Sequence, residues 1–361
     1  MNFRPLGRSG LHVSEISLGS WTTYGGSISS ADSKPLIRRA FDLGINLFDT
    51  ADVYVKGAAE LALGEAVREL PRGEIVVATK CMGRVGEGPL GRGLSRKHMF
   101  DALDASLKRL GLDYVDLYQF HAPDPETPIE ESLRALEDLT RSGRVRYVGF
   151  SNFDENPRLA EQAVAIQKRE HWQPFISSQP RYNLLDRHVE LGHAEFCQRN
   201  GIGLIVYSPL AQGVLTNKYA GGGRPQGSRA TGTYAHFLDS QKAILPENVA
   251  AAERLGAWCA KRGLEPGTVA LAWVLRNPGV ASAITGATSP EQLERNVKAL
   301  EVKLTDAEWR EVSRLALPKP AAKVARSSRA RRAAQRRPTS SRSRPSRPAT
   351  RRTKAPRSGK A

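Results

Sequence analysis

Short apolar runs alternate with amphipathic segments along most of the chain, and this alternation restricts the possible fold more than any other feature. Parallel strands need a crossover helix between them, so a repeated strand–helix pattern predicts a parallel sheet. Eight such units over about 300 residues predict a (β/α)8 barrel, with a doubly wound open sheet as the alternative. The runs are ISLGSW (16–21), INLFDTA (45–51), EIVVATK (74–80), VDLYQFH (115–121), VRYVGFSN (145–152), FISSQ (175–179), GLIVYSPL (203–210) and ASAITGA (281–287).

Two segments stand outside this repeat. The opening NFRPLGRSGLHVS has two short β-like runs around Gly7–Gly10, and it predicts a hairpin that closes the floor of the barrel. The stretch 211–245 is longer than an ordinary connection in such a barrel. Loops of that length are usually functional or disordered.

The basic charge is concentrated at one end of the chain. Residues 319–361 hold 16 of the 54 Lys and Arg residues and none of the 37 Asp and Glu residues. Residues 1–318 are therefore nearly neutral and form the expected barrel domain, followed by a disordered Arg/Lys/Ser/Pro-rich tail at 319–361. The tail is either an inert extension or a non-specific tether to nucleic acid or another polyanion through phosphates.

Several other classes of protein are disfavoured. Cys81, Cys197 and Cys259 are too few and too scattered for a disulfide framework, and they show no metal-ligand spacing. The N-terminus does not resemble a signal peptide, and no stretch approaches the ~20 apolar residues of a membrane span. We therefore expect a cytoplasmic protein with neither a membrane span nor a metal.

Polar residues end almost every apolar run. Asp49, Lys80 and His121 end the second, third and fourth runs, and Tyr54 follows the second. The carboxyl ends of all strands of a β/α barrel meet on one face, where catalytic groups collect. Each residue alone has an ordinary interpretation, such as a turn, a solvated lysine, a structural histidine or a packed tyrosine. A carboxylate, a lysine and an imidazole at successive strand ends instead indicate a site.

These four residue types suit proton donation by a phenol. A free Tyr has a pKa of about 10, and an adjacent Lys80 ammonium would favour the phenolate of Tyr54 and lower that value. Asp49 would keep Lys80 charged despite burial, and His121 would orient a carbonyl oxygen or share the proton transfer. None of them is a hydride source, so the site requires a nicotinamide cofactor.

The motifs DTADVY, VDLYQFH, GFSNF, SSQPRYNLL, VYSPLAQGVLTNKY and ITGATSPEQLERN resemble those of the aldo-keto reductases. The resemblance covers residues 3–317 and is closest to the branch that contains bacterial members and potassium-channel β subunits. It implies NADPH-dependent reduction of aldehydes and ketones, with Tyr54 as general acid. Lys80 and Asp49 would tune Tyr54, and His121 would position the substrate.

The same resemblance implies the residues that hold the cofactor. Arg295 stands where the family usually has Glu, which weakens the expected contact to adenine and adds a cation near the 2′-phosphate. The implied cofactor residues are Tyr207 as a platform under the nicotinamide; Ser151, Asn152 and Gln179 at its carboxamide; Ser208, Pro209, Leu210 and Gln212 at the pyrophosphate; Lys218 and Arg229 in a strap; Gly286, Thr288, Gln292, Arg295 and Asn296 at the adenosine phosphate; and Trp21 at the mouth.

Other interpretations stay open at this stage. Lys80 could form a Schiff base as in class I aldolases, or the chain could be a cofactor-binding regulatory subunit with slow turnover. GEGPLG (86–91) matches G-x-G-x-x-G, but Pro89 and the late helix start favour a loop on the substrate side. Relatives of the channel type form tetramers, so a homo-oligomer is possible. The expected substrate pocket for a small carbonyl compound consists of Trp21, Tyr24, Met82 and Phe153.

Overall fold

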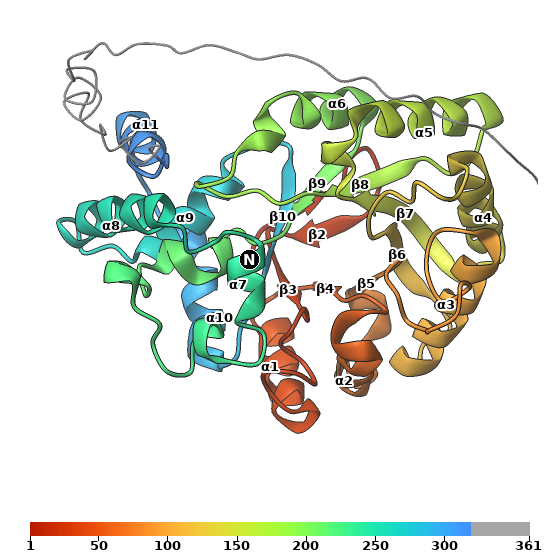
Figure 1. Cartoon of the computed structure of the whole chain (residues 1–361), viewed down its shortest axis with the longest axis horizontal. Coiled ribbons are helices and arrows are strands. Elements are labelled where there is room, and N and C mark those ends of the chain that lie inside the picture. Colours follow the sequence, from red (N-terminus) through yellow and green to blue (C-terminus); the bar gives the residue numbers. More distant parts are fainter. Residues whose placement is uncertain (319–361) are drawn as a thin grey trace, which may run out of the picture. The chain divides into compact units, whose positions relative to one another are not determined.

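Eight parallel strands close into a barrel in chain order, which confirms the predicted (β/α)8 architecture (Figure 1). The computed structural model describes residues 1–318, so the expectations for 319–361 lie outside the described residues. Each predicted apolar run overlaps one barrel strand, and two of the strands extend one residue beyond their run. The strands are β3 (Ile16–Gly19), β4 (Leu47–Asp49), β5 (Val76–Cys81), β6 (Val115–Phe120), β7 (Val145–Ser151), β8 (Phe175–Gln179), β9 (Gly203–Val206) and β10 (Val280–Thr285).

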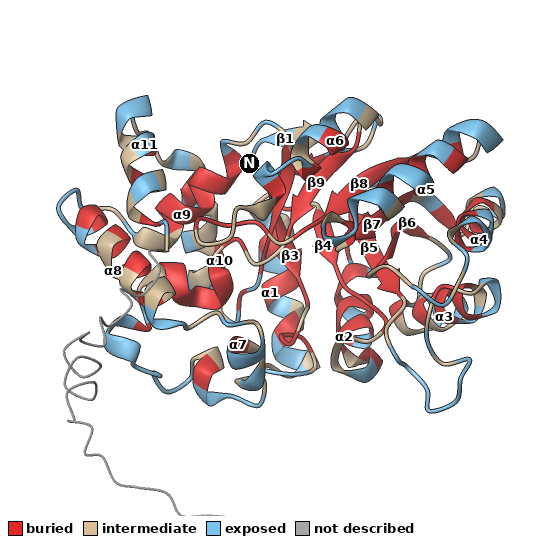
Figure 2. Cartoon of the chain, turned by 45° about the horizontal axis from the view of Figure 1, so that its top comes forward, coloured by how far each residue is buried: buried red, intermediate tan, exposed pale blue. Residues whose placement is uncertain are grey.

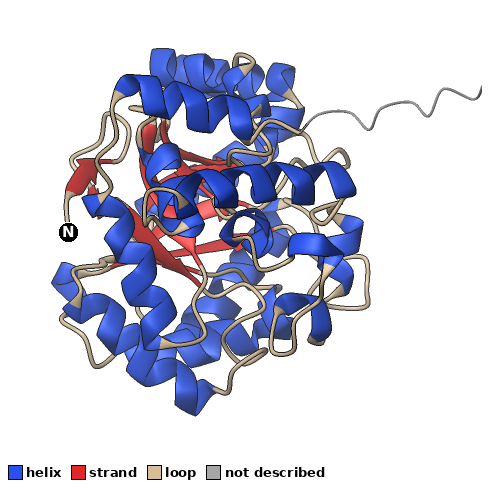
Figure 3. Ribbon diagram, turned by 90° about the vertical axis from the view of Figure 1, so that its left-hand side faces the viewer, coloured by secondary structure: helices blue, strands red, loops and turns tan. Residues whose placement is uncertain are grey.

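Helices surround these strands on the outside (Figures 1 and 3). Several helix ends follow from local sequence: Ser95 caps the start of α3 by accepting a hydrogen bond from the His98 N–H, and Gly111 ends it in the left-handed conformation. The helices are α1 (Ser30–Asp42), α2 (Ala58–Val67), α3 (Arg96–Leu110), α4 (Ile129–Arg141), α5 (Pro157–Glu170), α6 (His193–Asn200), α7 (His236–Ser240), α8 (Pro246–Ala260), α9 (Pro266–Leu275), α10 (Pro290–Val297) and α11 (Asp306–Leu315).

The N-terminal hairpin closes the amino end of the barrel, as predicted. It consists of β1 (Phe3–Pro5) and β2 (His12–Ser14), paired antiparallel. Its Leu6 and Val13 pack with side chains from the first residues of the barrel strands, such as Leu47. Gly7 in its turn has φ +62°, and a Cβ there would lie 2.3 Å from the Gly201 carbonyl oxygen, so only glycine fits.

Apolar side chains fill the barrel interior near the amino ends of the strands, and polar side chains lie near the carboxyl ends. Side chains two residues apart on a strand face the same side, so Leu47 and Asp49 both point inward, as do Val76, Ala78 and Lys80. The barrel strands are buried along most of their length (Figure 2). Arg146 on β7 is an exception and is exposed. With the hairpin over the amino end, the carboxyl end is left for a site.

The long segment 211–245 forms a series of short helical turns rather than a single loop. It contains three short 3₁₀ helices followed by α7. It reaches the segment after β3, where the Phe237 and Trp21 rings lie 5.0 Å apart between centroids. Within residues 1–318, no helix is long and apolar enough to cross a membrane. The 3₁₀ helices of the segment are η5 (Ala211–Thr216), η6 (Ala220–Gly222) and η7 (Arg229–Thr231).

Candidate active site at the carboxyl end of the barrel

The four residues that the sequence singles out lie together at the carboxyl ends of neighbouring strands. Asp49 is the last residue of β4, Lys80 is the penultimate residue of β5, and His121 directly follows β6. Tyr54 begins the short 3₁₀ helix η1 (Tyr54–Gly57) after β4. The next residue, Val55, has φ +50°, an uncommon conformation for a β-branched residue and of the kind found at functional sites.

A continuous chain of polar contacts joins these side chains. The Lys80 ammonium donates to Asp49 Oδ1 at 2.7 Å, to the Thr50 carbonyl oxygen at 2.7 Å and to the Tyr54 hydroxyl at 3.3 Å. The Tyr54 hydroxyl oxygen lies 3.3 Å from His121 Nε2. All three N–H groups of Lys80 are therefore used, and the phenol stands between the ammonium and the imidazole.

Burial controls the charges at this site. The Lys80 side chain is fully buried, which lowers its pKa, while the Asp49 carboxylate opposes that shift. Burial, with a smaller effect from the Lys80 charge, lowers the pKa of His121 to about 3, so the imidazole is neutral near neutral pH. Burial and then the charges of Asp49 and Asp52 raise the pKa of Tyr54 well above its usual value.

This last shift corrects the expectation that Lys80 would lower the pKa of Tyr54. The phenol loses its hydration when it is buried, and that loss outweighs the attraction of one nearby ammonium, which is itself paired with Asp49. Tyr54 is consequently a fully protonated acid at neutral pH. The hydroxyl keeps its proton, and Lys80 is placed to hydrogen-bond the hydroxyl oxygen.

The residues expected at the nicotinamide lie around the same four side chains. Gln179 Nε2 donates to Asp49 Oδ2 at 2.9 Å, and Ser151 Oγ donates to the Gln179 carbonyl oxygen at 2.7 Å. Asn152 Nδ2 donates to the His121 carbonyl oxygen at 2.9 Å, and the Tyr207 hydroxyl donates to Asn152 Oδ1 at 3.0 Å. The ends of β7, β8 and β9 are thus connected to the cluster of Asp49, Lys80, Tyr54 and His121.

The residues expected at the pyrophosphate and in the strap follow β9. Lys218 and Arg229 have no carboxylate partner among residues 1–318. Burial lowers the pKa of both cations, and the Arg229 charge lowers that of Lys218 further. The Arg229 guanidinium lies over the Trp21 ring, 4.9 Å from its centroid. The backbone that leads to them contains Ser208, Pro209, Leu210 and Gln212, with positive φ at Ser208 and Gln212.

The residues expected at the adenosine phosphate lie at the start of α10. Gly286 follows β10, and Thr288 donates from its backbone N–H to Gln292 Oε1 at 3.1 Å. Arg295 and Asn296 lie one turn further along the helix, and Arg295 is exposed to solvent. Free N–H groups at a helix start favour an anion, and an exposed guanidinium nearby adds to that preference.

Two of the four expected pocket residues are partly exposed, and the other two are buried. Trp21 and Met82 are partly exposed at strand ends, and Met82 has φ +139° directly after β5. Tyr24 and Phe153 are fully buried, and the rings of Phe153 and Phe150 pack at a tilt of 46° with centroids 5.0 Å apart. Trp21 and Met82 therefore offer surface to a ligand, whereas Tyr24 and Phe153 support the wall from behind.

Two buried carboxylates near the cluster around Lys80, Glu60 and Asp52, were not predicted from the sequence. Glu60 on α2 is fully buried, accepts from Thr79 Oγ1 at 2.6 Å and pairs with Arg109 of α3 at 2.7 Å. Asp52, inside DTADVY, is also buried. The signal for Glu60 was present, since it is a lone charge in the otherwise apolar segment AAELALG, whereas nothing local marks Asp52.

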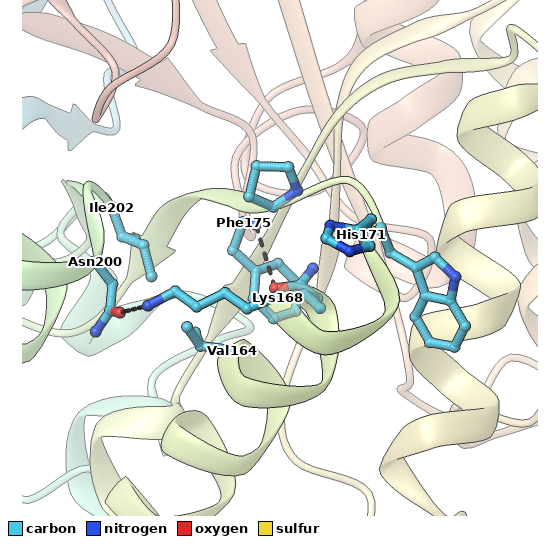
Figure 4. A pocket seen from close by; sticks show the side chains of 9 residues that line it. Val164, Lys168, His171, Phe175, Asn200 and Ile202 are labelled. Atoms are coloured by element: carbon cyan, nitrogen blue, oxygen red, sulfur yellow. Dashed lines mark hydrogen bonds between the residues drawn. The ribbon is translucent and has the colours of Figure 1, made fainter.

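A separate hollow of about 390 Å³, drawn in Figure 4, is lined by none of these residues. Its lining comes from the end of α5, the connection to β8, and the residues just before β9, including Lys168, Trp172 and Asn200. These connections are on the amino face of the barrel, opposite the strand ends described above. This hollow therefore has no part in the chemistry of the four residues.

Comparison with known proteins agrees with the geometry. The model of the family described as "Aldo/keto reductase family" matches residues 15–316. A "Putative voltage-gated potassium channel subunit beta" of Schizosaccharomyces pombe is 41% identical over 307 residues, covering 83% of this chain and 88% of that protein. A "Probable voltage-gated potassium channel subunit beta" of rice is 39% identical over 306 residues, covering 84% and 92%. The "L-glyceraldehyde 3-phosphate reductase" of Escherichia coli K12 is 39% identical over 309 residues, covering 83% and 88%.

Proposed function

The chain belongs to the aldo/keto reductase family of oxidoreductases, and from that premise we propose that it reduces aldehydes or ketones to alcohols with NADPH. The observation that supports this best is the contact chain from Asp49 through Lys80 and Tyr54 to His121, with no link longer than 3.3 Å. NADPH, when bound, supplies the hydride that none of these side chains carries.

Tyr54 is the proposed general acid. Its phenol is protonated at neutral pH, and proton donation to a carbonyl oxygen leaves a phenolate. Lys80 hydrogen-bonds the phenol oxygen and stabilises that phenolate, and Asp49 keeps Lys80 charged. Neutral His121 lies beside the hydroxyl and is proposed to orient the carbonyl oxygen by hydrogen bonding rather than by charge.

The chain's own residues fit a dinucleotide phosphate. Lys218 and Arg229 repel one another, have no carboxylate partner in the described part of the chain, and are partly desolvated. An anionic pyrophosphate would relieve both effects. We further propose that the start of α10, with Thr288, Gln292 and exposed Arg295, favours NADPH over NADH through the 2′-phosphate.

Steady-state oxidation of NADPH tests the function. The substrates are 4-nitrobenzaldehyde, methylglyoxal and L-glyceraldehyde 3-phosphate, the last because a relative is named as its reductase. Tyr54→Phe is expected to lower kcat by about 10²- to 10⁴-fold, with NADPH affinity unchanged. Tyr147→Phe, on β7 next to the barrel floor, is the matched control and is expected to keep full activity. Equal activity of Tyr54→Phe and the wild type would remove the proposed acid.

A second candidate is a cofactor-binding regulatory subunit, because several relatives are named as potassium-channel subunits. It predicts tight NADPH binding without turnover of any carbonyl compound. A Schiff-base lyase is disfavoured, since all three Lys80 N–H groups already have acceptors and Asp49 holds the charged form. Borohydride trapping of substrate on Lys80 would reverse that judgement.

Three further proposals concern the whole chain. We propose a domain boundary at residue 318, a cytoplasmic location and sequence-independent binding of nucleic acid by 319–361. Filter binding to DNA by the full chain and by residues 1–318 tests the last, and equal affinities would contradict it. Gel filtration with light scattering tests the proposed homo-oligomer.

A further inference from the structure

One buried carboxylate beside the proposed catalytic residues has no assigned part in the reaction. Asp52 lies between Asp49 and Tyr54 in the chain and is 1% exposed. Its backbone N–H donates to the Lys80 carbonyl oxygen at 3.2 Å, which ties it to β5. Neither carboxylate oxygen has a hydrogen-bond partner of good geometry, although the Val53 backbone N–H weakly favours the ionised form.

The cations near Asp52 are engaged elsewhere. Arg109 pairs with Glu60 and also donates to Ser106, while Lys80 uses its three N–H groups on other acceptors. Within residues 1–318, Asp52 therefore has no cation of its own. The titratable groups around it are Glu60 from α2, Arg109 from α3, Lys80 and Cys81 from β5, Tyr118 from β6 and Tyr54 from η1.

Such an environment favours the protonated acid. A buried carboxylate without hydrogen bonds or a partner of its own loses its hydration and gains little in return. Burial, and then repulsion from Glu60, raises the pKa of Asp52 to about 7, against the weaker attraction of Arg109 and Lys80. Asp52 thus changes its charge within the pH range in which the protein is expected to work.

The charge on Asp52 changes the pKa of Tyr54, the proposed acid. A negative charge on Asp52 raises the pKa of Tyr54 and also that of Lys80. When Tyr54 gives up its proton, the phenolate forms in a pocket that already holds the Asp49 carboxylate. A second carboxylate there makes the phenolate less stable, and a neutral Asp52 does not.

We propose, on the basis of the proposed reductase function, that Asp52 is a positioning residue whose protonation state controls proton donation by Tyr54. The neutral acid leaves Asp49 as the one carboxylate beside Lys80 and allows donation. Ionisation, with loss of the Asp52 proton to solvent, slows donation. Asp52 does not contact the substrate and gives it no proton.

The pH profile of kcat/KM for carbonyl reduction at saturating NADPH tests this proposal. Wild-type kcat/KM is expected to fall by about three- to tenfold as pH rises from 6 to 8, since one pKa unit corresponds to a factor of ten. Asp52→Asn has nearly the shape of the protonated Asp52 side chain and cannot ionise, so the fall in kcat/KM is expected to disappear. Asp101→Asn, an exposed carboxylate on α3 that pairs with Lys97, is the control and keeps the wild-type profile.

Two further variants separate charge from folding. Asp52→Ala also lacks the charge and is expected to show the flat profile, whereas Asp52→Glu retains a carboxylate and the fall. A merely structural role would change kcat or the melting temperature without altering the pH dependence. An active Asp52→Asn or Asp52→Ala with the wild-type profile overturns the proposal and leaves the reductase function standing. Absence of turnover by the wild type at every pH overturns both.

Discussion

Replacement of Lys80 by Met tests the buried ion pair at the centre of the site. Met has nearly the length of Lys but no charge, so Lys80→Met removes the 2.7 Å contact to Asp49 and leaves that carboxylate 4% exposed. The Gln179 amide is the one side-chain hydrogen bond to Asp49 that survives. Removing one partner of a buried pair costs about 3–5 kcal/mol, because the other charge stays buried and unpaired.

That magnitude is measurable in a protein of this size. A loss of about 3–5 kcal/mol corresponds to a fall in Tm of roughly 6–10 °C. The defect is expected to shrink at lower pH. At lower pH a buried carboxylate without a partner can take up a proton, and the neutral acid carries no uncompensated charge.

The double variant Asp49→Asn/Lys80→Met separates stability from catalysis. It has no uncompensated charge, so its Tm is expected to recover most of the loss, while carbonyl reduction stays abolished because the phenolate of Tyr54 has no ammonium beside it. Urea unfolding and Tm at pH 5 and pH 7 provide the stabilities. The reasoning is refuted if Lys80→Met has the same Tm as the wild type. It is also refuted if the double variant loses as much stability as the Asp49→Asn and Lys80→Met single variants lose together.

Three other perturbations have defined outcomes. Arg295→Ala is expected to raise the Kd for NADPH about tenfold and leave that for NADH unchanged; parallel shifts would remove Arg295 from the 2′-phosphate. Arg229→Ala is expected to weaken NADPH binding and reduce its dependence on salt, as titration at two ionic strengths would show; equal salt slopes would contradict this. Hydrogen bonds that His188 donates to Asp154 and Asp186 raise its pKa to about 9, so its stabilising effect is full below about pH 6.5 and lost as pH rises through 9. His188→Asn should therefore lower Tm at pH 6 but not at pH 10, and an equal loss at both would refute the charge argument.

The fold could be predicted because its signals are local and repeated. Each apolar run overlaps one strand, and the parallel connection that a helix enforces leaves few topologies. The strand limits were less accurate: the run 45–51 extends two residues beyond each end of β4, which is Leu47–Asp49. The excess includes Thr50, whose carbonyl oxygen accepts from Lys80, and a backbone acceptor leaves no trace in a sequence.

The sequence predicted that Asp49, Tyr54, Lys80 and His121 lie close together, but it did not predict the electrostatics around them. Asp49, Lys80 and His121 follow from strand ends that converge in a barrel. The pKa of Tyr54 depends on how completely the phenol is desolvated, which is a property of the assembled pocket. Asp52 shows the same limit, because its burial arises where β5, α2 and α3 pack around the turn rather than from any local pattern.

Charge is distributed differently in two regions at the mouth of the barrel. Lys80 is balanced by Asp49, and Arg109 by Glu60, while burial keeps Tyr54 and His121 neutral. The region around Tyr54 is therefore close to neutral, as a buried region has to be. Lys218 and Arg229, which follow β9, have no carboxylate partner among residues 1–318, and there Arg229 is half-buried and Lys218 exposed. We propose that a hydride donor that carries phosphates suits both regions, with its neutral ring against the balanced pocket and its phosphates beside these two cations.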